Sequence, residues 1–534
     1  MERNPKELAW REVGEWSLRT GRQHRNPFLD VDVDGCFRGP SGQEFMVPGF
    51  YDGEGVWRVR FSPDEPGRWK CRIASRPAEA ELCTEGTFRV AARQGRGFLK
   101  ATPGKAWGFH YESGEPALAF GDTTYNLFGM AHCGADVEAF LRRRAAQGIS
   151  LLRVRVPVSP FHPPDAHSKW QTRRTWPWGG SEQCPQFDRF NLDYFVTVDR
   201  VIGMCESLGL GLEVVMQAWG FEFPFNRRDV FVAEWEELWA RYLLARYDAF
   251  RCVWFWTLMN EYEYYPDGDW RYTSPVCDLW AMRMGRFVKR TGPHGHIVSV
   301  HNGPPEPPFA ERFRKDPGAV DNVMLQTWGT TDRDRGWLAA GIEEQVARSL
   351  AGWSGSAVFA EYGYEWNPEL EPMVSYHQGC DVEHTRRGGW RGLFCGLGVI
   401  HGWMNTWGPH MILDRDQAGM EQFLLMRRFF HEVVPFHKVR PAPEVIVRKD
   451  CEFGHGPSAL ASKERDLVAV YLPTGGRVDL DLPAGRRRSA QWFDPRTGRL
   501  SPASAGGRGK VRSFEAPAGG GDHPWDWVLV LRAQ

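Results

Sequence analysis

Two glutamates each follow a short apolar run, and together they have the chemistry to break a glycosidic bond. Glu261 follows Leu258-Met259-Asn260, and Glu361 follows Val358-Phe359-Ala360. Apolar runs of this length are typical of buried parallel strands. One carboxylic acid can protonate a leaving oxygen while a second carboxylate attacks the anomeric carbon. Either glutamate alone is as easily a helix cap or an arginine partner, so the pair carries the hypothesis.

The elements around this pair alternate between helix and strand across residues 98–440. The expected helices include one from Asp136 to Gly148 and others near 195–208 and 235–246. This alternation predicts a (β/α)8 barrel, whose reacting groups lie just past the carboxyl ends of its strands. An open doubly wound sheet is the competing topology, but no GxGxxG motif follows the first strand. The eight expected strands are 117–120, 150–156, 212–216, 253–258, 297–300, 323–326, 357–360 and 399–404.

The two ends of the chain have the pattern of β-sandwiches. Residues 56–61 and 69–73 alternate between apolar and polar side chains, with Pro66-Gly67 as the turn between them. Residues 467–472 and 478–482 surround Gly475-Gly476, and a turn follows Trp492-Phe493. We therefore expect an α/β chain of three domains: a sandwich over 1–95, a catalytic barrel over 98–440 and a second sandwich over 445–534.

Composition excludes several classes of partner. The chain has 66 Lys+Arg against 67 Asp+Glu, so it lacks the net positive charge that nucleic-acid binding requires. No apolar run is long enough to span a membrane. The polar start of the chain and 11 scattered cysteines without CxxC spacing indicate a cytoplasmic protein with no metal site. No cofactor-binding motif is present either. The 25 tryptophans exceed the 14 tyrosines, which suggests aromatic sugar contacts beyond core packing.

Asn260-Glu261 on the fourth strand and Glu361 on the seventh resemble the signature of glycoside hydrolase clan A, whose members are retaining enzymes on a (β/α)8 barrel. The resemblance implies that Glu261 is the acid/base, that Glu361 is the nucleophile and that Asn260 bonds the sugar 2-hydroxyl. Val154-Arg155-Val156-Pro157 resembles the strand-two arginine motif of the clan. It implies that Arg155 lies near the nucleophile and keeps it ionised.

Other segments are similar to the cellulase-like or apiosidase-like group of the clan. These are Pro48-Gly49-Phe50-Tyr51-Asp52-Gly53 in the first region and Gly121-Asp122-Thr123-Thr124-Tyr125 in the barrel. Trp492-Phe493-Asp494-Pro495-Arg496-Thr497-Gly498 resembles a collagen-binding-type module that follows such barrels. Relatives in the apiosidase-like group tend to carry Asp at the tip of strand four, where this chain has Asn260-Glu261. This departure leaves apiose specificity open.

Further polar and aromatic side chains near strand ends are candidate sugar contacts. Amides and carboxylates can hold adjacent hydroxyls, and an indole face can lie against a pyranose ring. The alternative for each is packing at the barrel rim, and Glu365 is also an alternative nucleophile. The candidates are Asp122, Gln217, Trp219, His301, Gln326, Trp328, Glu365, Trp403 and Trp407.

The leading hypothesis is a retaining, exo-acting glycoside hydrolase that cleaves oligo- or polysaccharide by double displacement. A non-catalytic carbohydrate-binding protein on the same barrel is the alternative, and an acyl- or metal-dependent hydrolase is a third. The residues leave the sugar, the linkage, the anomeric configuration and the oligomeric state open.

Overall fold

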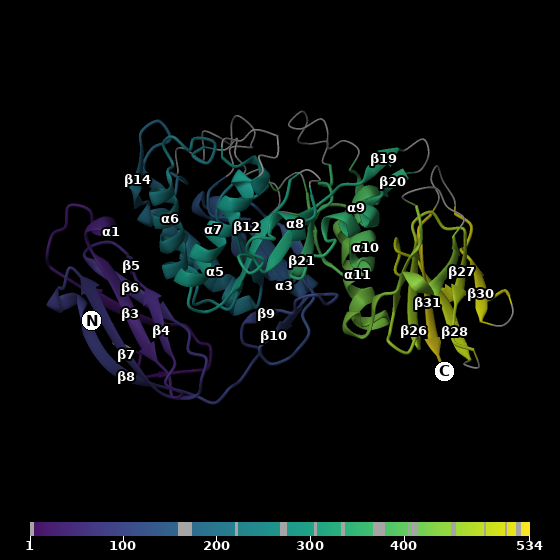
Figure 1. Cartoon of the computed structure of the whole chain (residues 1–534), viewed down its shortest axis with the longest axis horizontal. Helices are drawn as coiled ribbons and strands as arrows, with labels where there is room; N and C mark the ends of the chain where they lie inside the picture. The colour runs from purple at the N-terminus through teal and green to yellow at the C-terminus, as the bar shows by residue number, and fades with distance from the viewer. Residues whose placement is uncertain are drawn as a thin grey trace.

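Eight parallel strands form a closed barrel at the centre of the molecule (Figure 1). The computed structural model describes residues 5–158, 174–218, 223–266, 275–303, 307–332, 337–366, 380–403, 406, 415–449, 455–484, 487–507, 510–519 and 525–534. The strands follow each other around the barrel in chain order, and the last pairs with the first, which confirms the predicted barrel. They are β11 (Phe120–Thr123), β12 (Leu151–Arg155), β15 (Gly211–Val215), β16 (Val253–Thr257), β17 (Ile297–His301), β18 (Asn322–Gln326), β21 (Ser356–Glu361) and β22 (Gly398–His401).

Helices cover the outside of the barrel. Asp136, Asn191 and Asp381 cap three of them by accepting a backbone N–H of the first turn. Two of these helices end at Gly148 and Gly209, whose positive φ angles of 77° and 69° suit glycine. The helices are α2 (Leu127–His132), α3 (Val137–Gln147), α5 (Leu192–Leu208), α6 (Ala233–Tyr247), α7 (Val276–Thr291), α8 (Phe309–Arg312), α9 (Ile342–Ser349), α10 (Val382–Phe394) and α11 (Met420–Arg428).

The first barrel strand begins three residues later than the sequence pattern predicts. Residues 117–119 lie beside a hairpin of β9 (Leu99–Ala101) and β10 (Phe109–Tyr111), where the Ala117 N–H donates to the Phe109 carbonyl at 3.1 Å. The strand itself starts at Phe120. Asp122 is therefore inside the strand and not beyond its end.

The interior of the barrel changes from apolar to polar along its axis. Near the amino ends of the strands, Leu151, Phe255 and Ile297 form an apolar cluster with Leu99 and Phe109 of the hairpin. Further along the strands come charged and hydroxyl side chains, which contact one another through hydrogen bonds and ion pairs. This polar layer comprises Arg153, Glu213, Thr257, Ser299 and His301, all fully or almost fully buried.

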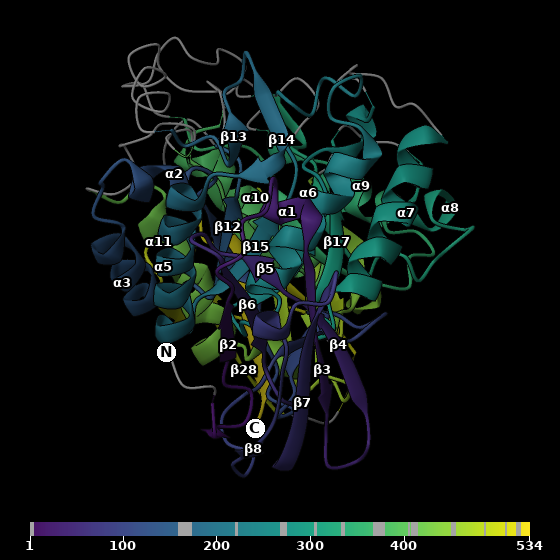
Figure 2. The ribbon, with the colours of Figure 1, turned by 90° about the vertical axis from the view of Figure 1, so that its left-hand side faces the viewer.

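Two sheets precede the barrel (Figure 2). They enclose one core that includes Trp16, Trp57 and Trp69. The five-stranded sheet has the order β1 (Glu7–Leu8), β8 (Thr84–Val90), β7 (Gly67–Arg76), β3 (Asp32–Arg38) and β4 (Glu44–Pro48). The three-stranded sheet has the order β2 (Gly14–Arg19), β6 (Val56–Phe61) and β5 (Phe50–Tyr51), and the short helix α1 (Pro27–Asp30) follows β2 in the chain.

Two further sheets follow the barrel and share a core with Trp492 and Trp527. One has the order β23 (Arg440–Pro441), β25 (Ser458–Ala461), β26 (Leu467–Leu472), β31 (Trp527–Ala533), β28 (Arg488–Phe493) and β29 (Leu500–Pro502). The other has β24 (Ile446–Lys449), β27 (Arg477–Asp481) and β30 (Val511–Glu515). Short hairpins extend from the barrel: β13 (Trp178–Gly180) with β14 (Pro185–Phe190), and β19 (Thr330–Asp332) with β20 (Trp337–Ala340).

Charged side chains join both flanking regions to the barrel. Arg60 of β6 lies 2.8 Å from Asp199 of α5, and Asp199 also pairs with Arg246 of α6. On the other side, Arg386 of α10 lies 2.9 Å from Asp526, and both side chains are at most 1% exposed. The flanking sheets lie on opposite sides of the barrel in Figure 1.

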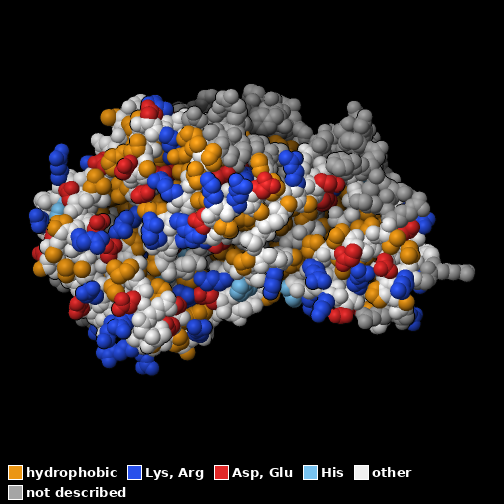
Figure 3. Space-filling model, in the orientation of Figure 1, with side chains coloured by type: hydrophobic (Ala, Val, Ile, Leu, Met, Phe, Trp, Pro, Cys, Tyr) orange, Lys and Arg blue, Asp and Glu red, His pale blue; other side chains and the backbone are white. Residues whose placement is uncertain are grey.

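On the face drawn in Figure 3, Lys and Arg side chains are interspersed with Asp and Glu side chains. None of the helices in the described parts of the chain is long and apolar enough to cross a membrane.

Candidate active site

Glu261 and Glu361 lie at the carboxyl ends of β16 and β21, on the same face of the barrel. Glu361 is the last residue of its strand, whereas Glu261 lies four residues beyond β16 and has a left-handed backbone, with φ 51° and ψ 59°. Such a conformation is strained for a non-glycine residue and is frequent at functional sites. The two side chains are only 8% and 7% exposed.

Glu361 receives hydrogen bonds from several strands. The Gln326 Nε2 donates to its Oε1 at 3.0 Å, and the Tyr364 hydroxyl donates to its Oε2 at 3.0 Å. The guanidinium of Arg153 donates to the same Oε2 at 3.3 Å. These three donors favour the carboxylate form of Glu361.

The backbone of Glu261 determines the tautomer of His301. Its N–H donates to Nδ1 of His301 at 3.2 Å, so the proton of the neutral imidazole is on Nε2. This Nε2 lies 3.7 Å from Oε2 of Glu361. Burial, with Arg153 nearby, holds the pKa of His301 well below its ordinary value, so the ring stays neutral.

The two carboxyl groups differ in their neighbours. Burial raises the pKa of both groups. The negative charges of Glu361 and Glu263 raise the pKa of Glu261 further, whereas the charge of Arg153 and the hydrogen bond from Tyr364 oppose the rise at Glu361. We conclude that Glu361 ionises first and Glu261 keeps its proton, as an acid and a nucleophile in one site require.

Arg153, and not Arg155, is the residue that forms the ion pair with Glu361. The sequence motif placed this role on Arg155; both guanidiniums lie over the Tyr125 ring, but among the described residues the ion pair with Glu361 belongs to Arg153. Arg153 lies between Glu361 and Glu213, 3.3 Å from each. Side chains two residues apart on a strand share a face, so the pattern alone does not separate the two arginines.

Asn260 has a fixed amide orientation. Its Oδ1 accepts from Arg153 Nη2 at 2.5 Å and from the Tyr125 hydroxyl at 3.3 Å. Because Arg153 and Tyr125 are both donors, the amide oxygen is turned toward them, and within the described ranges the hydrogen bonds of the Asn260 side chain are made by Oδ1 and not by Nδ2. This leaves an amide donor available next to Glu261.

Four residues of this site were not predicted: Tyr125, Tyr364, Arg153 and Glu213. Tyr125 stands in a motif that resembles the apiosidase-like group, and Tyr364 lies three residues after the predicted nucleophile, but neither position alone indicates a role. Tyr125 lies in the turn between β11 and α2, where no periodicity fixes the direction of a side chain.

Asp122 and Glu365 lie in a separate buried network, contrary to the prediction that they contact substrate. Asp122 Oδ2 accepts from Arg144 of α3 at 2.6 Å, on the outside of the barrel. His401 Nε2 lies 3.1 Å from Glu365, and its Nδ1 lies 3.7 Å from Asp122. Glu365 also accepts the backbone N–H of Gly419 at 2.8 Å. Glu365 therefore lacks the position that the alternative nucleophile needs.

Of the other predicted sugar contacts, Gln217 and Trp403 are buried and Trp328 is half-buried. The Gln217 amide donates to Glu236 at 2.5 Å and accepts a hydrogen bond from Arg228 at 3.0 Å. Trp403 is 5% exposed and forms a β-bridge with Glu365. Trp328 is half-buried and packs edge-on against Tyr364, with ring centroids 6.3 Å apart. Trp219 and Trp407 lie outside the described residues.

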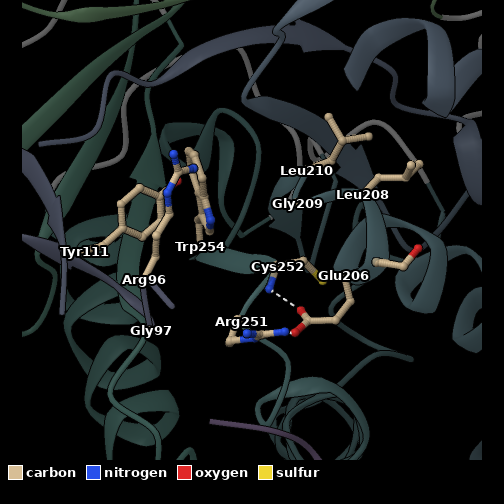
Figure 4. A pocket seen from close by; sticks show the side chains of 11 residues that line it. Arg96, Gly97, Tyr111, Glu206, Leu208, Gly209, Leu210, Arg251, Cys252 and Trp254 are labelled. Carbon is tan, nitrogen blue, oxygen red and sulfur yellow. Dashed lines mark hydrogen bonds and ion pairs between the residues drawn. The ribbon is translucent and has the colours of Figure 1, made fainter. Parts of the chain in front are cut away.

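A pocket of about 330 Å³ lies at the opposite end of the barrel (Figure 4). It is lined by Tyr111, Trp254, Arg96 and the Arg251–Glu206 ion pair, near the amino ends of β15 and β16. In a (β/α)8 barrel this end contributes stability, and the reacting groups lie at the other end. No group of three or more His, Cys, Asp or Glu side chains that could hold a metal occurs within the described ranges.

Three family models match successive parts of the chain. Residues 106–422 match "Apiosidase-like, catalytic domain", which covers more than half of the chain. Residues 8–76 match "Domain of unknown function (DUF5060)". Residues 441–532 match "Putative collagen-binding domain of a collagenase".

Solved structures share the fold over most of the chain. The crystal structure of a "putative glycoside hydrolase" from Bacteroides vulgatus ATCC 8482 has a TM-score of 0.73 and 19% identity, over 99% of this chain and 100% of that one. A glycoside hydrolase family 5 structure from the same organism has a TM-score of 0.57 and 16% identity, over 82% and 93%. At these identities the likeness shows the fold. No curated protein matches the chain.

Proposed function

Because the chain belongs to the family with an apiosidase-like catalytic domain, we propose that it is a retaining glycoside hydrolase of oligo- or polysaccharide. The observation that carries the proposal is the different environment of two buried carboxyl groups at one end of the barrel. Retaining hydrolysis needs one carboxyl group protonated and the other ionised. Two solved neighbours that carry a glycoside hydrolase name support the same reaction class.

In the first step, Glu361 attacks the anomeric carbon and a covalent glycosyl ester forms. Glu261 gives its proton to the glycosidic oxygen as the bond to the leaving group breaks. Arg153, Tyr364 and Gln326 hold the attacking carboxylate in a single orientation. This orientation lowers the entropic part of the barrier.

In the second step, Glu261 acts as a base. It takes a proton from water, the water oxygen attacks the anomeric carbon, and the ester bond to Glu361 breaks. The pKa of Glu261 falls when Glu361 is esterified, because the adjacent negative charge is then gone. The same residue therefore has the protonation state that each step requires.

Asn260 is assigned to the 2-hydroxyl of the sugar in this proposal. Its free amide nitrogen is a donor beside the acid/base, which is the position that the clan resemblance implies. The half-buried Trp328 is an aromatic wall candidate, and His301 can donate from Nε2. Exo action on short saccharides and a cytoplasmic location are further parts of the proposal.

The proposal is tested with a panel of aryl glycosides that carry good and poor leaving groups. We expect Glu361→Ala to lose activity on all substrates of the wild type, by more than about 10⁴-fold. Glu261→Ala should lose about 10²- to 10⁴-fold on poor leaving groups, and far less on 2,4-dinitrophenyl glycosides, whose departure needs no proton.

Glu206→Gln is the matched control, because Glu206 pairs with Arg251 at the opposite end of the barrel and should not affect turnover. Wild-type rates in Glu361→Ala would contradict the assignment. A wild type that binds saccharides without hydrolysing any of the panel would favour the non-catalytic alternative.

A further inference from the structure

Five side chains in the site form a closed ring of hydrogen bonds. Arg153 joins Glu361 at 3.3 Å to Asn260 at 2.5 Å on one side. On the other side, the Tyr125 hydroxyl donates to Asn260 Oδ1 at 3.3 Å. The Tyr364 hydroxyl lies 3.1 Å from the Tyr125 oxygen and 3.0 Å from Glu361 Oε2. The ring therefore connects the nucleophile to the amide that faces the sugar.

The Tyr364 hydroxyl has one proton and two acceptors at almost equal distance. Burial raises the pKa of both tyrosines, so both hydroxyls remain protonated donors. The proton of Tyr125 is given to Asn260, which leaves its oxygen as an acceptor for Tyr364. While Glu361 is a carboxylate, the charge-assisted bond to Glu361 is the stronger one.

Attack by Glu361 changes this balance, because the carboxylate becomes a neutral ester. The Tyr364 proton then prefers the Tyr125 oxygen. A hydroxyl that accepts a hydrogen bond becomes a better donor, because successive bonds polarise each other. Tyr125 then polarises the Asn260 amide, and its Nδ2 donates more strongly to the sugar.

We propose that Tyr125 is a positioning residue that couples the loss of charge on Glu361 to a stronger bond between Asn260 and the sugar 2-hydroxyl. The coupling runs through Tyr364 and rests on the proposed function. Because the bond strengthens as the reaction proceeds, it stabilises the transition state more than the bound substrate, and this difference accelerates the step.

The surroundings hold both tyrosines in place. Tyr125 and Tyr364 are at most 2% exposed and pack with Trp328 and Trp366. The backbone N–H of Tyr125 donates to the Thr406 hydroxyl at 3.0 Å, and its carbonyl accepts from the Arg155 N–H at 3.1 Å. One contact comes from β12 and the other from Thr406, which follows β22 in the chain, so Tyr125 is fixed from two separate segments, as a relay of hydrogen bonds requires.

The test compares a 4-nitrophenyl glycoside that the wild type hydrolyses with its 2-deoxy counterpart. The ratio of their kcat/KM values measures the contribution of the 2-hydroxyl. We expect this ratio to fall by about threefold or more in Tyr125→Phe and also in Tyr364→Phe. Tyr364→Phe is the more informative variant, because it leaves both hydrogen-bond donors to Asn260, Arg153 and Tyr125, in place. The double variant should show no further fall, since either change interrupts the same path.

Tyr194→Phe is the matched control. It removes a buried hydroxyl that donates to the Val156 carbonyl at 2.7 Å, outside the ring, and should leave the ratio unchanged. If Tyr125→Phe does not fold, by circular dichroism, Tyr364→Phe alone decides the outcome. An unchanged ratio in either folded variant, or multiplying effects in the double variant, would overturn the coupling. A wild type without glycosidase activity would instead refute the proposed function on which the coupling rests.

Discussion

At the scale of single residues, the site shows how neighbours divide one function between two identical side chains. Glu261 and Glu361 are equally buried, so desolvation alone does not distinguish them. Arg153 makes the difference, because its positive charge acts chiefly on Glu361. Arg153 also forms an ion pair with Glu213, and the Thr257 hydroxyl donates to Glu213 at 2.9 Å.

The pH profile of activity tests this division. Lysine is shorter than arginine, so in Arg153→Lys the positive charge lies farther from Glu361. The pKa of Glu361 should therefore rise in the free enzyme. The acidic limb of kcat/KM against pH would then move to higher pH, by about one unit. The basic limb reports the loss of the Glu261 proton and should move less.

Arg155→Lys is the matched control for this measurement, because Arg155 is equally buried on the same strand. We expect its acidic limb to stay close to that of the wild type. A larger shift in Arg155→Lys than in Arg153→Lys would return the ionising role to Arg155.

At the scale of elements, the buried network around His401 joins β11, β22 and α3 near the start of α11. His401 lies between Asp122 and Glu365, and Arg144 supports Asp122. Although burial opposes its charge, the adjacent carboxylates of Asp122 and Glu365 raise the pKa of His401 to about 9. The ends of the first and last barrel strands are thereby fixed to each other.

The stability of the protein should depend on the charge of His401. The folded pKa lies above the unfolded value of about 6.5, so the contribution is complete below that pH and is lost as pH rises through about 9. It amounts to about 3 kcal/mol at most. We expect the Tm of the wild type to fall between pH 6.5 and 9.5.

His401→Gln removes the titrating group, so its Tm should be lower at pH 6.5 and should fall less over the same interval. Differential scanning calorimetry at both pH values measures the difference. Parallel curves for the two proteins would mean that His401 is not charged in the fold.

The elements explain which parts of the site could be predicted. Buried parallel strands have a strong apolar pattern, and this pattern located β16 and β21 and with them Glu261 and Glu361. The three-residue shift of β11 was not predictable from local sequence, because the β9–β10 hairpin takes up residues 117–119. Asp122 was misplaced for this reason.

Side-chain direction sets the second limit on prediction. Arg153 and Arg155 are two residues apart on β12 and share a face, so the sequence pattern does not show which of them reaches Glu361. Tyr125 and Tyr364 lie in segments after strands, where contacts distant in sequence fix the side chains. Gln326, in contrast, was predicted in the site, and the structure places it against Glu361.

At the scale of the whole molecule, buried charges fix the flanking sheets to the barrel. Asp526 accepts from Arg386 and Arg496, and Tyr471 donates to it at 3.2 Å. These charges hold its pKa well below the ordinary value, despite burial. The C-terminal sheets are therefore attached to α10, the helix that follows the strand of Glu361. The division of the chain into domains at about 95 and 445 stays a prediction.

Asp526→Asn should loosen this attachment. Loss of the carboxylate leaves the buried guanidinium of Arg386 with Glu383, at 3.3 Å, as its remaining ionic partner, at a cost of about 1.5 to 3 kcal/mol. We expect a lower Tm and faster proteolysis between the barrel and the C-terminal sheets. Glu138→Ala is the control, because its pair with Arg142 on α3 is exposed and contributes about 0.5 kcal/mol or less. Equal Tm values for the two variants would contradict the structural role of Asp526.

Trapping the covalent intermediate tests whether Glu361 is the nucleophile of a retaining glycosidase. The protein is treated with 2,4-dinitrophenyl 2-deoxy-2-fluoro glycosides of the sugar that it hydrolyses, digested and analysed by mass spectrometry. We predict a fluorosugar ester on the peptide that contains Glu361, at the Glu361 side chain. An adduct on another residue such as Glu365, or turnover with inversion of the anomeric centre and no adduct, would contradict the role of Glu361 as the nucleophile.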